Sequence, residues 1–430
     1  MYNEPIKQGG QVSQPMGCGP ILPVFGRDTI LPVFGRDTTT LRQHVFEYVR
    51  ASGRAARADV TRALGISPGS ATTLTADLIA GGMLREVEGL PRELGRGRPP
   101  VALEVVPDCK HVIGIKLSDE IHTAVLADFA GNIVADASFT TPHPRKDLAV
   151  ILDEMDTLIA ALLASASKTI AQISAVAVGL SGIVDHITGT VVWSPFLTTR
   201  DVDLSAGFAA RHDCPLFVDN DANMLTLAEL WFGVGRDLSN FAVVTIEHGV
   251  GMGIVLDNRL FRGSRGMGLE LGHTKVQLDG ALCRCGQRGC LEAYLADYAL
   301  AREAATALDR APSLTQSQHG LLESLYAQAK AGNKAASTIF ERAGRYLSVG
   351  LSNVVQLFDP KLIILSGERM RYDYLYAESV MKDMQSLTLS DGRAPCPVEI
   401  HGWGDLVWAR GATALALSEI TTAALSETKA

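Results

Sequence analysis

A block of cysteines with one histidine, between residues 272 and 294, constrains this chain more than any other stretch. Three of its seven cysteines fall within eight residues, and a histidine precedes them by ten residues; the set is His273, Cys283, Cys285 and Cys290. Three thiolates and one imidazole complete a tetrahedral ligand set for Zn²⁺. Gly286 and Gly289 lie between the last two thiols, where the chain must turn back and glycine allows positive φ angles. We therefore predict a structural zinc site; the alternative is three reduced cysteines in a surface loop.

Carboxylates flank this block on both sides. Glu270 lies three residues before His273, and Glu292 lies two residues after Cys290. A zinc ion with four protein ligands has no open position for water, so the site should not be hydrolytic. We expect the ion to brace a loop that presents carboxylates to a polar ligand.

The block resembles the signature of the ROK family (repressors, open reading frames and kinases). That signature reads Glu-x-Gly-His followed by Cys-x-Cys-Gly-x-x-Gly-Cys-x-Glu, and every position is filled here between Glu270 and Glu292. The resemblance covers about residues 40–420. Within the family, the chain is similar to regulators of the xylose and N-acetylglucosamine repressor type. It implies that the histidine and the three cysteines hold zinc, and that Glu270, His273 and Glu292 line a sugar site.

The charge of the chain is unevenly distributed. The net charge is −8, yet residues 39–100 contain nine arginines, no lysine and six acidic residues, which leaves them at +3. Residues 1–38 contain three basic and three acidic residues, so the remainder is strongly acidic. A basic segment joined to an acidic body favours a nucleic-acid-binding module, although a solvated basic face is the simpler alternative.

Residues 39–106 have the pattern of a winged helix-turn-helix domain. We expect helices from about Thr40 to Ser52, over Arg57–Leu64, and from the cap Ser67 to about Ala80. Helix, helix, short glycine turn and helix is the helix-turn-helix arrangement. Small polar residues face outward at the start of the third helix and can approach base edges; these are Ser70, Thr72 and Thr73.

A wing should follow the third helix. Met83–Val87 and Pro100–Val106 read as two strands, and the loop between them contains Arg96 and Arg98. Arginines on a flexible loop suit a narrow minor groove, whose negative potential attracts them, and a solvated hairpin tip is the alternative. The Gly-Arg-Pro at residues 97–99 resembles the wing of ROK repressors.

Residues 1–38, which contain a nine-residue duplication (21–29 and 30–38), are predicted to be a disordered tail.

Residues 107–430 alternate strands and helices and are predicted to be an α/β domain. The pattern is two β-β-β-α-β-α halves with a cleft between them, which is the two-lobed, actin-like ATPase fold used by sugar kinases. We draw the lobes at roughly 107–240 and 241–430. The resemblance therefore implies a ROK sugar-kinase-like body behind the winged helix.

The sugar side of the kinase machinery is largely present. The family motif Asn-Asp-x-Asn occurs at residues 220–223, so Asn220 and Asp221 are expected to contact a sugar, with Asp221 as a vestigial base. The alternative role for Asp221 is to cap the helix that follows. The family's Pro-Asn-Leu is Pro195-Phe196-Leu197 here, so the amide that holds sugar hydroxyls is replaced by an aromatic ring that could stack on a sugar.

The phosphate side differs from that of family kinases. Their Asp-x-Gly-Gly-Thr loop is replaced by Lys116-Leu117-Ser118-Asp119-Glu120, which has lost both glycines and gained two acids. In the second phosphate loop, Glu247 and His248 replace the usual small residues, while three glycines remain. We therefore predict a degenerate ATP site and no enzymatic activity.

These patterns together predict a sugar-responsive, DNA-binding transcriptional regulator that acts as a repressor. We expect Zn²⁺ as a structural cofactor, operator DNA and a sugar or sugar derivative as partners, and a homodimer. Neither a membrane-spanning run nor a signal peptide is evident, which predicts a cytoplasmic protein. Two alternatives remain open: an active ROK sugar kinase with a DNA-binding appendage, and a regulator that answers to a partner protein.

Overall fold

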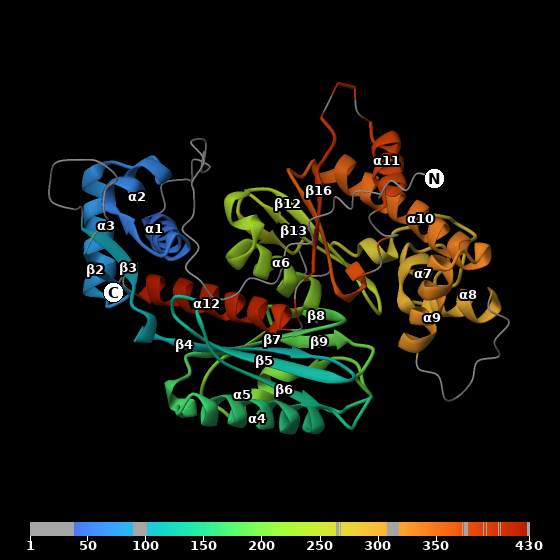
Figure 1. Ribbon diagram of the computed structural model, residues 1–430. Coiled ribbons are helices and arrows are strands. Elements are labelled where there is room, and N and C mark those ends of the chain that lie inside the picture. Colours follow the sequence, from blue (N-terminus) through green and yellow to red (C-terminus); the bar gives the residue numbers. More distant parts are fainter. Residues whose placement is uncertain are drawn as a thin grey trace, which may run out of the picture.

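A computed structural model of the chain is shown in Figure 1. The structure describes residues 38–88, 101–263, 266, 268–307, 318–371, 373, 377–389, 391–392, 394–402, 404 and 406–427. The predicted tail up to residue 37, with most of the duplication, lies outside the described residues. The predicted wing loop with Arg96 and Arg98 lies outside them as well.

The three N-terminal helices are those predicted: α1 (Thr38–Ser52), α2 (Arg57–Leu64) and α3 (Pro68–Ala80). Ser67 caps α3 by accepting a hydrogen bond from the Ser70 amide at 3.0 Å, as expected for a serine before a proline. Gly65 takes the left-handed conformation (φ 63°) that ends α2. Apolar side chains of all three helices are buried in one core, among them Val45, Val49, Val60, Leu74 and Leu78.

A small antiparallel sheet completes this domain. The two wing strands are β2 (Leu84–Val87) and β3 (Ala102–Val105), paired so that Leu84 lies opposite Val105. A third strand, β1 (Ala55–Ala56), pairs with the other edge of β3. The sequence did not predict β1, because two alanines have no strand periodicity and the pairing comes from the partner strand.

The body contains two five-stranded sheets of identical topology. The first has the order β11-β7-β4-β5-β6 and the second β14-β13-β12-β15-β16. When the five strands of each sheet are numbered in chain order and the first sheet is read from β6, both sheets have the order 3-2-1-4-5. The bounds are β4 (His111–Leu117), β5 (Ile121–Asp128), β6 (Ile133–Thr140), β7 (Ala175–Leu180), β11 (Leu216–Asn220), β12 (Phe241–Ile246), β13 (Val250–Leu256), β14 (Arg259–Phe261), β15 (Ile363–Ser366) and β16 (Val398–His401). Each of these sheets has five strands, one more than the predicted β-β-β-α-β-α pattern contains.

The last helix of each half lies between the two sheets. These helices are α6 (Asp221–Phe232), which packs on α12, β12 and β13, and α12 (Val407–Glu427), which packs on β4 and β7. The approach is close, since a Cβ added at Gly411 would lie 1.8 Å from the Met224 carbonyl oxygen. The predicted second lobe of roughly 241–430 includes α12, which packs on β4 and β7 of the first sheet. Helix α12 buries its apolar face against the first sheet, which Figure 1 shows beneath it.

The remaining elements cover the outer faces of the sheets. In the first lobe these are α4 (Leu148–Ser165), α5 (Leu204–Ala209) and a three-stranded ribbon of β8 (Ile183–Asp185), β9 (Thr190–Trp193) and β10 (Val202–Asp203). In the second lobe they are α7 (Glu292–Leu295), α8 (Asp297–Ala307), α9 (Gln318–Lys330), α10 (Lys334–Phe358) and α11 (Glu378–Leu387). Within the described ranges, no helix combines the length and apolar character needed to cross a bilayer.

Candidate effector and metal site

The predicted sugar residues Asn220 and Asp221 lie where β11 ends and α6 begins. Asn220 is the N-cap of α6: its Oδ1 accepts from the Ala222 amide at 2.8 Å, and its Nδ2 donates to the Gly182 carbonyl at 2.7 Å. Asp221 Oδ2 accepts from the Ser181 hydroxyl at 2.5 Å. The N-cap of the helix, the alternative role considered for Asp221, is thus mainly Asn220. Sequence reasoning missed Ser181, the hydrogen-bond partner of Asp221.

An ion pair joins the lobes beside Asp221. Asp219, on β11 of the first lobe, accepts from Arg262 Nε at 2.6 Å, and Arg262 follows β14 of the second lobe. The other Asp219 oxygen accepts from the Asn223 side chain at 2.7 Å. Asp219 is 3% exposed, so a change in the angle between the lobes must move a buried, charge-assisted contact.

Four of the five predicted sugar residues share one electrostatic environment. Glu270 precedes the short 3₁₀ helix η4 (Leu271–His273) and is exposed to solvent. Surrounding protein atoms raise the pKa of Glu270, and the negative charges of Glu292 and Asp221 raise it further against the opposing influence of His273. Charges from both lobes therefore act on Glu270, since Asp221 belongs to the first lobe and His273 and Glu292 belong to the second.

The four predicted metal ligands converge. One ligand atom each from His273, Cys283, Cys285 and Cys290 lies within 4.8 Å of the others. Cys285 Sγ and Cys290 Sγ are 3.7 Å apart, and two thiolates bound to one tetrahedral zinc at about 2.3 Å would be about 3.8 Å apart. His273 Nδ1 lies 3.7 Å from Cys283 Sγ. The donor set and its spacing fit a single tetrahedral metal ion.

The glycines of this loop have the conformations that were predicted. Gly286 and Gly289 have φ values of 87° and 76°, in the left-handed region where side chains are disfavoured. A Cβ at Gly289 would also lie 1.7 Å from the Gln277 carbonyl oxygen. The turn that brings Cys283 and Cys290 together thus depends on both glycines.

Two residues around the cluster were missed by sequence reasoning. The Lys275 ammonium donates to Cys290 Sγ at 3.1 Å and to the His273 carbonyl at 3.0 Å. The Tyr298 hydroxyl lies 3.4 Å from Cys283 Sγ and 3.3 Å from Glu292 Oε1, so it links the cluster to a predicted sugar ligand. Lys275 lies within the block and Tyr298 lies six residues after Glu292, but neither belongs to the ligand motif.

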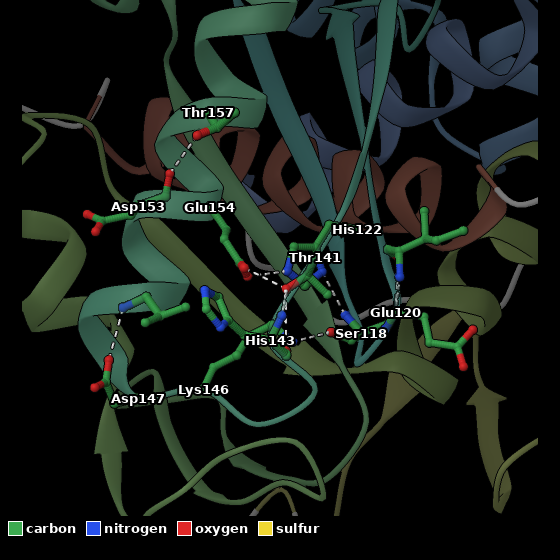
Figure 2. Close-up of polar contacts among 12 residues, drawn as sticks. Ser118, Glu120, His122, Thr141, His143, Lys146, Asp147, Asp153, Glu154 and Thr157 are labelled. Carbon is green, nitrogen blue, oxygen red and sulfur yellow. Dashed lines mark hydrogen bonds and ion pairs between the residues drawn. The ribbon is translucent and has the colours of Figure 1, made fainter. Parts of the chain in front are cut away.

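The first hairpin, where a kinase would cradle phosphate, is tied down by its own residues (Figure 2). The Ser118 amide donates to His122 Nδ1 at 3.0 Å, and the Glu120 and Ile121 amides donate to Ser118 Oγ at 3.2 and 3.1 Å. His122 Nε2 then donates to Glu154 at 2.8 Å, and Thr141 donates to the other Glu154 oxygen at 2.5 Å. Burial lowers the pKa of His122, which agrees with this neutral tautomer.

Lys146 connects this hairpin to the loop that carries Phe196. The Lys146 side chain is 1% exposed, and its Nζ donates to the Ser118 carbonyl at 3.1 Å and lies 5.2 Å from the centre of the Phe196 ring. Phe196 is 2% exposed. The expectation that this ring could stack on a sugar was therefore wrong, because the ring is packed into the first-lobe core.

The second phosphate loop is filled by side chains of the second lobe. Arg369 donates to both oxygens of Asp297 at 2.6 and 2.5 Å, and His248 Nδ1 lies 3.0 Å from Asp297 Oδ2. Burial alone would raise the pKa of Asp297, but the hydrogen bonds from His248 and Arg369 outweigh it and the pKa falls below its usual value. Glu247 packs against Gly367, where an added Cβ would lie 3.1 Å from Glu247 Oε1.

The glycines retained in this loop have a packing role. A Cβ at Gly253 would lie 2.1 Å from Thr226 Oγ1, and one at Gly251 would lie 3.0 Å from the Ala222 Cβ. Both glycines thus allow β13 to approach α6 closely. Their presence is explained without a bound phosphate.

The winged helix docks on the two helices between the sheets. The Arg50 guanidinium of α1 lies 3.2 Å from the centre of the Trp231 ring near the end of α6. Phe46 contacts Phe129 with ring centroids 5.0 Å apart, and Gln43 Nε2 donates to a threonine hydroxyl of α12 at 3.2 Å. The winged helix and the body therefore share one hydrophobic core.

The predicted base-reading residues of α3 lie at the surface. Ser70, Thr72 and Thr73 are exposed, while the neighbouring Ala71 and Leu74 are buried. Thr72 Oγ1 donates to the Pro68 carbonyl at 2.8 Å, and the Ser70 and Ser67 hydroxyls are 2.9 Å apart. These side chains form a small polar face on α3 that is open to a partner.

Comparison with known proteins agrees with this architecture. The ROK family model matches residues 112–419. The xylose repressor of Caldicellulosiruptor bescii is 26% identical over 369 residues, which are 85% of this chain and 92% of that protein. A solved ROK family transcriptional regulator, a homologue of the Escherichia coli Mlc protein, matches with a TM-score of 0.73 at 24% identity and covers 91% of this chain and 98% of its own.

A kinase shares the body of this fold. The ROK family glucokinase of Streptomyces griseus, solved with glucose and AMPPNP, matches with a TM-score of 0.60 at 27% identity, over 71% of this chain and 98% of its own. The fold is therefore a mixed α/β, actin-like sugar-kinase body that follows an N-terminal helical domain of the DNA-binding type. Since the family model spans more than half of its length, the chain belongs to the ROK family.

Proposed function

We propose that this chain is a sugar-responsive transcriptional repressor that binds operator DNA through its winged helix. The observation that carries the proposal is helix α6, which begins at Asp221 in the candidate sugar site and ends against the winged helix at Trp231. A xylose repressor of similar length and sequence supports the same role. We also propose that the chain forms a homodimer, which would bind paired operator half-sites about 34 Å apart. We propose a cytoplasmic location as well.

The proposed coupling passes through rigid elements. A sugar that draws Glu270 and Glu292 toward Asp221 would close the lobes, and the movement would rotate α6 against α12. Because α1 packs on both helices, that rotation would tilt the winged helix. Coupling between sites in such switches is commonly about 1–3 kcal/mol, or 5–150-fold in affinity.

The metal in this proposal is Zn²⁺, held by His273, Cys283, Cys285 and Cys290. The ion would supply a tetrahedral crosslink, with no open position for substrate. His273 would then be fixed in orientation, and Tyr298 would transmit that rigidity from Cys283 to Glu292 through its hydroxyl. Lys275 would offset the negative charge that three thiolates leave on the site.

Sugar binding in this proposal rests on carboxylates. Asp221, Glu270 and Glu292 would accept hydrogen bonds from sugar hydroxyls, and His273 would add a contact beside its metal bond. Asn220 would act by holding the start of α6 in place, since both ends of its amide already contact the backbone.

We also propose that the ATP site is degenerate. Backbone amides that could cradle phosphate in the first hairpin donate within the turn itself. In the second loop, the Glu247 side chain lies over Gly367, and His248, Asp297 and Arg369 form a closed ion network. A nucleotide would have to displace these contacts before it could bind.

The DNA-binding residues proposed are Ser70, Thr72 and Thr73 of α3 with Arg96 and Arg98 of the wing. The serine and threonines would meet base edges in the major groove, and the arginines would enter the minor groove. Arg98→Ala should weaken binding and lower its salt dependence. An unchanged affinity with an unchanged salt slope would count against the wing as a minor-groove reader.

The test uses the full chain, an operator selected from random duplexes, and fluorescence anisotropy with and without sugars. We expect one sugar to lower operator affinity, and Asp221→Asn to remove that response while leaving sugar-free DNA binding intact. A panel of sugars that changes nothing would refute the sugar-responsive role.

An active kinase is the second candidate, favoured by Asp221 and by the similarity of the body to a glucokinase. Incubation with ATP and hexoses or N-acetylhexosamines, followed by detection of ADP, separates the two. Turnover that disappears in Asp221→Asn would establish the kinase and refute the degenerate ATP site.

A further inference from the structure

The metal cluster contains a pair of cysteines with the properties of an oxidation site. We propose that hydrogen peroxide joins Cys285 and Cys290 in a disulfide, that the metal is released as a result, and that the sugar response is thereby switched off. The last step rests on the proposed function, whereas the disulfide and the metal release depend on neither sugar nor DNA. Three observations lead to the proposal: the exposure of one sulfur, the proximity of a second, and the connection of both to Glu292.

The three cysteines of the cluster differ in exposure. Cys283 is 3% exposed and Cys290 is 0% exposed, whereas Cys285 is exposed. Cys285 is followed by Gly286, and a Cβ added to that glycine would meet nothing within 4 Å, so the surface around this turn is open. A small oxidant would therefore meet Cys285 before it met the two buried thiols.

A second sulfur lies within reach of the exposed one. Cys290 Sγ is 3.7 Å from Cys285 Sγ. Cysteines that sense oxidants typically combine an accessible sulfur with a nearby cysteine that captures the oxidised form. A disulfide requires the sulfurs to approach to about 2.05 Å, and the exposed turn at Gly286 can supply that movement, because the open space around it leaves it unobstructed.

The oxidation balances with peroxide as the oxidant. A thiol that binds zinc is held as the thiolate, so both sulfurs are nucleophilic in the loaded site. The Cys285 thiolate attacks one peroxide oxygen; an S–O bond forms as the O–O bond breaks, and the hydroxide that leaves is protonated by solvent. The Cys290 thiolate then attacks the Cys285 sulfur; the S–S bond forms as the S–O bond breaks, and the second hydroxide is protonated as well. Two thiolates thus lose two electrons, and one peroxide with two protons becomes two waters.

The disulfide would dismantle the metal site and disturb its neighbours. His273 and Cys283 alone would not hold the ion, because a structural zinc site needs four ligands. Cys290 lies directly before α7, and its carbonyl accepts from the Ala293 amide at 3.1 Å. A movement of Cys290 would therefore reach Glu292, and the loss of the ion would free His273, so two proposed sugar ligands change together.

Metal release and disulfide mapping test the proposal directly. The zinc-loaded full chain would be treated with a small excess of hydrogen peroxide, zinc release would be followed with a chromogenic chelator, and disulfides would be mapped by mass spectrometry of peptides. We expect the loss of the one zinc per chain together with a bond between Cys285 and Cys290, both reversed by dithiothreitol and added zinc. Retention of zinc under peroxide, or a disulfide that excludes Cys285, would overturn the proposal.

A ligand replacement separates oxidation from simple loss of the metal. Cys285→His keeps four zinc ligands in a Cys₂His₂ set but removes the exposed sulfur, so it should retain its zinc under peroxide that empties the wild-type site. Release at the wild-type rate would refute the role of Cys285. Should this variant bind no zinc, Cys283→Ser decides, because it keeps the reacting pair: peroxide must still join Cys285 to Cys290, and absence of that bond overturns the proposal.

Another exposed cysteine provides the matched control. Cys109 lies at the end of the short 3₁₀ helix η1 (Pro107–Cys109) and is exposed, but it does not belong to the cluster. Cys109→Ser should release zinc under peroxide as wild type does. Protection of the zinc by this substitution would place the reactive sulfur outside the cluster and overturn the assignment.

The regulatory step is measured separately, by operator binding with and without the sugar. After oxidation the ratio of operator affinities should fall to about 1, from the 5-fold or more expected of the reduced chain, and dithiothreitol with zinc should restore it. A sugar response that persists in the oxidised, zinc-free chain would overturn this step. If no sugar acts on the reduced chain, the proposed function fails, while the disulfide and the zinc release are still decided by their own measurements.

Discussion

The contact between Arg50 and Trp231 should decide whether a sugar can affect DNA binding. Trp231 is 9% exposed near the end of α6, and the Arg50 guanidinium covers its ring at 3.2 Å. Arg50 Nε is buried with no hydrogen-bond partner among the described residues, and burial lowers the pKa of Arg50 to about 9. The ring is therefore a principal partner of a poorly solvated cation, which makes the contact costly to remove.

We expect Trp231→Ala to uncouple the two sites. A desolvated cation–π contact contributes about 2 kcal/mol, and truncation of a buried aromatic commonly costs about 3–5 kcal/mol in total. That loss exceeds the coupling of about 1–3 kcal/mol expected for such a switch. The ratio of operator affinities without and with the sugar should therefore fall to about 1, where wild type shows about 5-fold or more.

The assay is operator binding by fluorescence anisotropy, with sugar affinity measured separately by calorimetry. Phe340→Ala is the matched control, because Phe340 is a similarly buried aromatic (5% exposed) in the second-lobe core, remote from the winged helix. The control should lose stability but keep the affinity ratio. The reasoning is refuted if Trp231→Ala binds both sugar and operator and retains the wild-type ratio.

Three further predictions concern the metal, the pH dependence and the helices between the sheets. Cys290→Ser should abolish the one zinc per chain that we expect elemental analysis to find in wild type, and should weaken sugar binding more than operator binding. The hydrogen bond to Asp297 raises the folded-state pKa of His248. Protonated His248 therefore stabilises the folded state fully below pH 6.5, and this contribution is lost as the pH rises through the raised pKa. In thermal melts from pH 6 to 8, the melting temperature of wild type should exceed that of His248→Gln by more at pH 6 than at pH 8. A difference in melting temperature that is equal at every pH would contradict this. Gly411→Ala should cost about 3 kcal/mol or more in denaturant titrations, because its Cβ would lie 1.8 Å from a backbone oxygen of α6, whereas Gly402→Ala, with no neighbour within 4 Å, should be tolerated.

Local chemistry allowed most of the elements to be predicted. Ser67 and Pro68 start α3, and Gly65 ends α2, because caps and turns depend on a few neighbouring residues. The metal cluster was equally predictable, since three of its ligands and both positive-φ glycines lie within one short loop. Strands such as β4 and β12 were recognisable from their buried apolar runs.

Other features depended on contacts between distant segments. The burial of Phe196 follows from Lys146 and the first-lobe core, and the sequence around Phe196 gives no sign of either. Helix α12 is the last helix of the second half yet packs on the first sheet, because the apolar side chains of both share one core. Tyr298 could not be tied to the metal cluster before the fold brought α8 beside it.

By itself, then, the sequence determined the ligand types of the metal cluster, the helix-turn-helix pattern and the acidic character of the sugar-site residues, because these depend on residue chemistry and short spacing. Only the tertiary structure decided that Asp221 and Glu292, from different lobes, both raise the pKa of Glu270, and that the hairpin amides donate to Ser118 and His122. It also decided that α6 joins the sugar site to Arg50 of the winged helix. Such relations arise from packing between segments far apart in the chain, which no local pattern encodes.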